Sequence, residues 1–282
     1  MVFILVTRDD VRMPDPNSVS WQMHADPTMW IAGIASLYLQ ALHPQAVAGV
    51  VQNSNFQADP LGRLKRTADF VGLGVYGTDE EIATASARVR ATHRSLRGVV
   101  DGRPFRVDEP ELLLWVHCSE VYCFETVLDR AGYGLSDRQK DRYYEEQRFA
   151  AGLVGLHPDE VPGSRREMLD YFERMRPVLR RTTDSDVIYT FLHGPPVQGF
   201  VRHGLPVYRV LVGHLAYSVL PDWALDLHGR PPYAHADLWL RMMRRAALLV
   251  PGKIRRLAPP GHLKRAIERH GKHVTPNKAR LP

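Results

Sequence analysis

The chain has 282 residues, of which 44% are hydrophobic and 24% charged, a globular composition that excludes intrinsic disorder. Two cysteines exclude a disulfide scaffold, and the five-residue separation of Cys118 and Cys123 fits neither a CxxC redox pair nor a zinc knuckle. The net charge of +6 is uneven, because residues 241–282 carry twelve Lys or Arg and one acid, whereas the first 240 residues have a net charge of −5.

The first segments predict an irregular arm followed by two helices. Residues 1–26 contain Pro14 and Pro16 and predict the arm. Asp26 followed by a proline marks a helix start, and apolar residues then recur at helical spacing until Pro44, where we expect the helix to end. The Asp59–Pro60 pair repeats the start signal for a second helix. Because the first helix is apolar on most faces, we expect it near the centre of the fold.

The remaining segments also follow helical spacing. Thr78 and Glu81 form a capping box for a helix that runs to Gly98, and another helix spans about residues 110–131. Ser136 and Ser164 begin two more, and the later patterns cover residues 184–192, 206–218, 233–250 and 261–270. Strand alternation is almost absent, and no hairpin is expected. The sequence therefore predicts an all-α protein of about ten helices, with one domain over residues 27–250 and a basic C-terminal tail over 251–282 that holds one short helix.

Two histidines fall on the apolar faces of consecutive predicted helices. His93 lies between Val89 and Leu96, and His117 between Leu113 and Phe124. A buried imidazole must be hydrogen-bonded, charge-paired or metal-bound, because an unpaired ring nitrogen is costly to bury. A short connection makes the two helices antiparallel neighbours, so the side chains are expected to face one cavity. The alternative is that each is an ordinary core histidine with a hydrogen-bond partner.

A second candidate lies in the segment RLKRT. Arg63 and Thr67 are four residues apart and share one helical face, whereas Lys65 and Arg66 point elsewhere. A guanidinium beside a hydroxyl suits a carboxylate or a polarised oxygen species. The alternative, which spacing alone favours, is a solvated basic face.

Other motifs are weaker. Zinc-site spacings such as HExxH are absent, as are P-loop and nucleophile-elbow signatures. A hydrolase on a di-metal scaffold is disfavoured, since the several carboxylates and histidines it needs cannot be placed. Haem requires no clustered motif, because the porphyrin supplies four iron ligands. Glu120, one turn beyond His117, could act as an acid or base, although a surface or hydrogen-bonded carboxylate is the commoner case.

Several segments in order resemble a known family. They are ALHPQAVAGV (41–50), NSNFQADPLGRLKRT (53–67), VYGTDEEIATASARVRATHRSLRG (75–98), DEPELLLWVHCSEVYCFE (108–125), DRQKDRYYEE (137–146) and PPGHLKRAIERHG (259–271). Together they cover about residues 28–271. The chain resembles the rubber-oxygenase catalytic-domain family, which includes latex-clearing proteins and the MpaB-type oxygenase of mycophenolic acid biosynthesis.

The resemblance implies a globin-like all-α core around one haem b. It implies that His93 binds the haem iron, and that Arg63 and Thr67 form a catalytic and cofactor-binding pair near the distal haem face. His117 matches another recurrent position, either a lining residue of the haem pocket or a second iron ligand. Latex-clearing proteins carry a lysine where this chain has Arg66, whose guanidinium is a poor iron ligand. Their catalytic glutamate also has no counterpart, since no acid lies between Asp26 and Asp59.

These departures argue against polyisoprene cleavage. They favour a haem-dependent oxidoreductase, either an oxygenase or a dehydrogenase, that acts on a small lipophilic or secondary-metabolite substrate with O2 or an electron donor as partner. The alternative is a non-catalytic helical module whose basic tail binds an anionic membrane surface or nucleic acid.

The basic tail and the chain start bear on location. Aromatic residues are sparse between the basic residues of the tail, which disfavours nucleic acid as its binding partner. Weak contact with a membrane surface is then the remaining role for the tail. The candidates are Arg241, Arg244, Arg245, Lys253, Arg255, Arg256, Lys264 and Arg265. The first residues lack the basic segment of a secretory signal, and the apolar run over residues 207–220 is interrupted and too short to span a bilayer. The sequence therefore predicts a cytoplasmic protein that contacts membranes peripherally at most.

Overall fold

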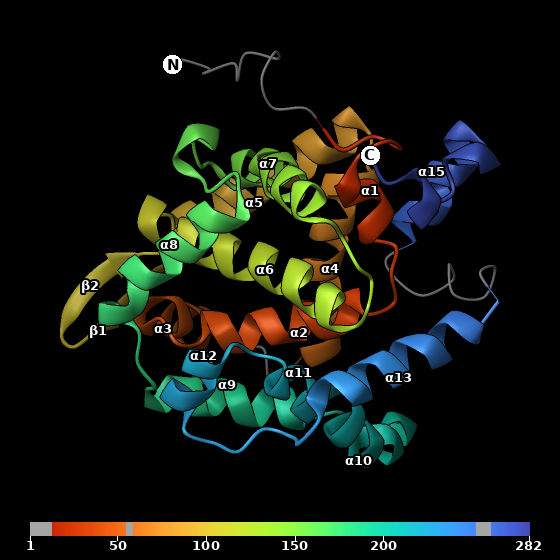
Figure 1. The fold of residues 1–282 in the computed structure, drawn as a ribbon. Helices are drawn as coiled ribbons and strands as arrows, with labels where there is room; N and C mark the ends of the chain where they lie inside the picture. Colours follow the sequence, from red (N-terminus) through yellow and green to blue (C-terminus); the bar gives the residue numbers. More distant parts are fainter. Residues whose placement is uncertain (1–12, 55–58, 252–260) are drawn as a thin grey trace, which may run out of the picture.

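A computed structural model describes residues 13–54, 59–251 and 261–282 (Figure 1). Its α-helices are α1 (Val19–Met23), α2 (Met29–Gln40), α3 (Pro44–Asn53), α4 (Pro60–Tyr76), α5 (Asp79–Ser95), α6 (Pro110–Arg130), α7 (Asp137–Val154), α8 (Arg165–Met175), α9 (Thr183–His193), α10 (Leu205–Tyr208), α11 (Leu215–Ser218), α12 (Asp222–His228), α13 (Ala236–Leu249) and α15 (His262–His270). The strands are β1 (Arg97–Val100) and β2 (Arg103–Arg106). The fold is essentially all-α, which confirms the predicted class.

The centre of the molecule is α6, which is packed between α2 on one side and α7 on the other (Figure 1). Trp115 of α6 is fully buried, and its indole Nε1 donates a hydrogen bond of 3.1 Å to the carbonyl of Gln40 at the end of α2. Tyr38 of α2 is also fully buried, as expected for a helix that is apolar on most faces. These contacts fix α6, which carries His117, relative to the rest of the core.

Most predicted helix starts are confirmed by their caps. The Thr78 side chain accepts from the backbone of Glu81, whose carboxylate accepts from the backbone of Thr78, so the capping box is complete. Ser136 begins α7 with a second complete capping box, and the side chain of Ser164 caps α8 by accepting from the backbone of Glu167. Asp59 accepts from the backbone of Gly62 at the start of α4. Local side-chain chemistry therefore decides where these helices begin.

The expectation that no hairpin forms was wrong. Strands β1 and β2 pair antiparallel, with Arg97 opposite Arg106 and Val100 opposite Arg103. Asp101 and Gly102, between the strands, have φ angles of 51° and 74°. Two left-handed residues in succession make the type I′ turn that matches strand twist, and Asp-Gly is among its preferred sequences. The hairpin was missed because four-residue strands give almost no alternation to detect.

Three helices were also not predicted. Pro44 ends the segment that contains α2 but is also the first residue of α3, a position where proline is favoured. The segment expected to be irregular contains α1, whose residues are buried. The third is α12, which has seven residues and therefore too few turns for a periodic pattern.

The C-terminal segment lies against the body of the protein. Ala266 and Ile267 of α15 are buried in a cluster with Trp21 of α1 and Val75 of α4. The Trp21 indole donates a 2.9 Å hydrogen bond to the carbonyl of Val274. The basic residues at 253, 255 and 256, and the chain start used to predict the absence of a signal, lie outside the described residues.

Candidate functional site

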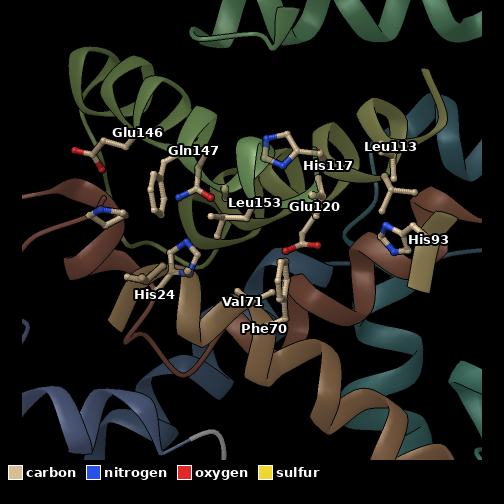
Figure 2. A pocket seen from close by; sticks show the side chains of 17 residues that line it. His24, Phe70, Val71, His93, Leu113, His117, Glu120, Glu146, Gln147 and Leu153 are labelled. Carbon is tan, nitrogen blue, oxygen red and sulfur yellow. The ribbon is translucent and has the colours of Figure 1, made fainter. Parts of the chain in front are cut away.

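A cavity lies between α4, α5, α6 and α7 (Figure 2). Its volume is about 80 Å³, and the atom-free space including its opening to solvent is about 660 Å³. The lining is mostly apolar, with a few polar side chains that enter from different helices. The lining residues are Pro14, His24, Phe70, Val71, Gly74, Val75, His93, Leu113, Val116, His117, Glu120, Glu146, Gln147, Phe149, Ala150, Leu153 and Val154.

The structure brings His93 and His117 to this one cavity, His93 from α5 and His117 from α6 (Figure 2). Nδ1 of His93 and Nε2 of His117 are both buried and have no hydrogen-bond partner among the described residues. Burial lowers the pKa of His117 to about 4 and also lowers the pKa of His93, where the charge of Asp108 opposes the effect. Both rings are therefore neutral near pH 7, and each has a buried nitrogen without a partner.

Glu120 lies between these histidines in the cavity, with its carboxylate near Phe70 and Val71 of α4 (Figure 2). It accepts no hydrogen bond from the part of the chain that the structure describes. Burial among apolar side chains raises its pKa to about 7. The surface or hydrogen-bonded carboxylate that the sequence favoured is therefore not what is found. The residue can hold or release a proton near neutral pH.

His24 is a site residue that the sequence analysis missed. It follows α1, lines the cavity, and its Nε2 lies 3.2 Å from the hydroxyl of Tyr143 on α7. Burial lowers its pKa to about 3, so the ring is neutral. No sequence signal could have found it, because His24 comes from a short helix in a segment without periodicity.

Arg63 and Thr67 are not among the residues that line the cavity. Arg63 donates a hydrogen bond to the hydroxyl of Ser54, and the pKa of Arg63 is lowered by partial burial and by the neighbouring Arg66. The Thr67 side chain is exposed, and its hydroxyl donates to the carbonyl of Arg63 at 3.3 Å. Both residues lie on the helical face of Val71, one and two turns nearer the start of α4. They therefore lie outside the cavity, nearer the start of the helix that forms one of its walls.

The donor chemistry of the cavity fits haem better than a bare metal ion. Within the described ranges, no group of three or more His, Cys, Asp or Glu side chains could hold a metal ion. Haem iron needs only one or two protein ligands, and a neutral imidazole with an unpaired nitrogen is a suitable ligand. The cavity is smaller than the roughly 300–1,000 Å³ of typical ligand sites. A porphyrin would therefore require its walls to separate.

Comparisons with known proteins point to one family. A family model described as "ER-bound oxygenase mpaB/B'/Rubber oxygenase, catalytic domain" matches residues 21–250. This range contains nearly every residue that lines the cavity. No curated protein and no solved structure gives a significant match. The match indicates an oxygenase, and thus an oxidoreductase that acts on a substrate with O2.

Proposed function

We propose, from the premise that the chain belongs to the MpaB and rubber-oxygenase catalytic-domain family, that it is a haem b-dependent oxidoreductase of small lipophilic substrates. The observation that carries this proposal is the pair of buried, unpartnered ring nitrogens of His93 and His117 in one apolar cavity. His93 would bind the iron. Haem, when bound, supplies the oxidising chemistry.

The side chains of the cavity have distinct tasks in this proposal. His93 is neutral at pH 7, so its lone pair is available to a metal without loss of a proton. Phe70, Val71 and Leu153 exclude water and favour an apolar substrate. Glu120, with a pKa near 7, would accept or donate a proton at its carboxylate.

Arg63 and Thr67 would act at the edge of the bound cofactor. The closed cavity is too small for a porphyrin, and α4 forms one of its walls. If the cavity opens along α4, the first residues it reaches on the same helical face are Thr67 and then Arg63. A guanidinium there can pair with a carboxylate, so we propose that Arg63 anchors a haem propionate and that Thr67 adds a hydroxyl donor.

The second candidate function is a non-catalytic module whose basic tail binds an anionic surface. The described part of the tail does not favour it, because several of its charges are already used within the protein. Lys264 lies 3.7 Å from Glu268, and Arg244, a basic candidate in α13 just before the tail, pairs with Asp26 at 2.8 Å. Arg265 lies 3.8 Å from Glu81. We retain a cytoplasmic location as part of the proposal.

The experiment is a hemin titration of the full-length protein, followed by its visible absorption spectrum. Wild type should bind hemin with a sharp Soret band that saturates at one equivalent, because His93 would bind the iron. His93→Ala should lose that band or weaken hemin binding by at least about tenfold. His157→Ala is the matched control, since His157 is exposed and does not line the cavity. Wild-type protein that stays colourless with hemin would overturn the proposal.

The same spectra separate the two roles left open for His117. If His117 is a second iron ligand, the ferric protein is six-coordinate and low-spin, and His117→Leu converts it to a high-spin form. If His117 only lines the pocket, the spin state of that variant stays unchanged while the band remains.

A further inference from the structure

The solvent side of α13 is apolar. Leu238, Trp239, Met242 and Leu249 are 57%, 51%, 50% and 85% exposed. Residues 238, 242 and 249 recur at helical spacing, so they form one stripe along the helix. On the opposite side, Ala236 and Leu240 are buried against the protein. An amphipathic helix normally turns its single apolar face toward the protein interior. Helix α13 has a buried apolar side and, in addition, an apolar stripe that faces solvent.

A second exposed apolar segment lies beside this helix. Residues 199–214 form a 3-10 turn, α10 and a π-helix (Arg209–His214), and they expose Phe200, Val207, Val210 and Leu211. Tyr233, just before α13, ties the two segments together. Its hydroxyl donates to the carbonyl of Val210 at 3.3 Å, and its ring packs edge-on against His214 with centroids 4.2 Å apart. Figure 1 shows α10 and α13 in the same lower part of the molecule. We call these eight exposed apolar side chains the apolar face.

The segments that carry the apolar face have charges of one sign. Residues 199–221 and 238–250 contain no acid, and they carry exposed Arg202, Arg209, Arg241 and Arg245. The nearest acid of α13 is Asp237, which is neutralised by Arg130 at 2.6 Å. Arg202 and Arg245 form no hydrogen bond or ion pair with the residues described, so their charges are available to a partner.

This combination fits an anionic lipid surface. Exposed apolar side chains with a tryptophan and a cationic border are typical of segments that lie in the interface of a bilayer. The described chain has no helix long and apolar enough to cross one. A second copy of this chain would bring like charges together, which opposes self-association through the same surface.

We infer that the apolar face is a membrane-docking surface, with its apolar side chains at the boundary of headgroups and acyl chains and its arginines on anionic lipid. None of its eight apolar side chains lines the cavity that α4, α5, α6 and α7 enclose. Trp239 and Leu249 provide the apolar contact. Arg202 and Arg245 provide the preference for anionic headgroups.

The test is co-sedimentation of the full-length protein with vesicles of pure phosphatidylcholine and with vesicles containing roughly 30% phosphatidylserine, at low and high salt. Wild type should bind the anionic vesicles and be released by salt. The double variant Trp239→Ser/Leu249→Ser should bind at least about tenfold more weakly. The affinity of Arg202→Gln/Arg245→Gln for the anionic vesicles should fall roughly fivefold for each arginine removed. Its binding should also depend less on salt.

The matched control is Val99→Ser/Val178→Ser, which removes two side chains that are 51% and 46% exposed on other elements. It should bind like wild type, and circular dichroism should show all variants folded. Unchanged binding in both apolar-face variants would overturn the inference. So would sedimentation equilibrium showing a wild-type dimer that Trp239→Ser/Leu249→Ser converts to a monomer, because the face would then join two copies.

Discussion

Burial sets the protonation of three cavity side chains. His24 and His117 have pKa values of about 3 and about 4, and Glu120 has one of about 7. Desolvation disfavours the charged form of each group, so it lowers the pKa of an imidazole and raises that of a carboxyl. At pH 7 the site therefore combines neutral imidazoles with one carboxyl group, that of Glu120, which is about half protonated. This is a suitable state for binding an iron porphyrin and for moving one proton.

The Glu120 carboxyl makes stability depend on pH. Its folded pKa lies above the ordinary value of 4.5, so its favourable contribution is complete below about pH 4.5 and is lost as pH rises through about 7. Glu120→Gln should therefore gain about 1–3 kcal/mol in free energy of unfolding, relative to wild type, between pH 4.5 and pH 8. Urea unfolding of the hemin-free proteins at both pH values measures this difference. Glu160→Gln, at an exposed site, should show no such gain, and an equal pH dependence in wild type and Glu120→Gln would contradict a desolvated carboxyl.

At the scale of elements, helix α4 connects the cavity to the C-terminal segment. One side of α4 supplies Phe70 and Val71 to the cavity. Val75 and Tyr76, at its end, pack against α15, and Arg269 of α15 donates to the carbonyl of Tyr76 at 2.6 Å. The position of a cavity wall therefore depends on contacts far along the chain.

Ile267→Ala tests this dependence. Ile267 is 9% exposed and lies in the cluster with Trp21 and Val75, so its truncation should lower the free energy of unfolding by about 2–4 kcal/mol. The variant should also bind hemin more weakly, because α4 is held less firmly. Lys264→Ala, on the exposed side of α15, is the control for both the unfolding and the hemin-binding measurements. Full stability in Ile267→Ala would show that α15 does not support α4.

Sequence reasoning succeeded where local chemistry determines structure. Caps such as Thr78 and Ser136 locate helix starts, and helical periodicity placed both His93 and His117 toward the interior. It failed at Pro44, which follows one helix and is also the first residue of the next. It also failed where a helix or strand is too short to show a periodic pattern. The depth of the cavity beside Glu120 could not be predicted, because it depends on how α4, α6 and α7 pack. The same applies to His24, which reaches the site only through tertiary structure.

At the scale of the whole molecule, the chain has two separate faces of interest. The cavity lies within the family-matched range and holds the candidate iron ligand. The apolar face lies on α13 and residues 199–214 (Figure 1), and none of its eight side chains lines the cavity. An oxidoreductase of lipophilic substrates would benefit from such a division, since the second face would hold the protein where these substrates collect. Loss of membrane docking should therefore leave hemin binding in solution unchanged.

The central claim is that the His93 imidazole holds haem iron in this cavity. The most direct test is ligand rescue in His93→Gly, where a small exogenous imidazole can occupy the space left by the side chain. Hemin-loaded His93→Gly should lack the wild-type Soret band and recover it on addition of imidazole, with saturation at one imidazole per protein. His157→Gly should be unaffected by imidazole. A wild-type spectrum in His93→Gly without added imidazole would show that another residue binds the iron, and would contradict the account.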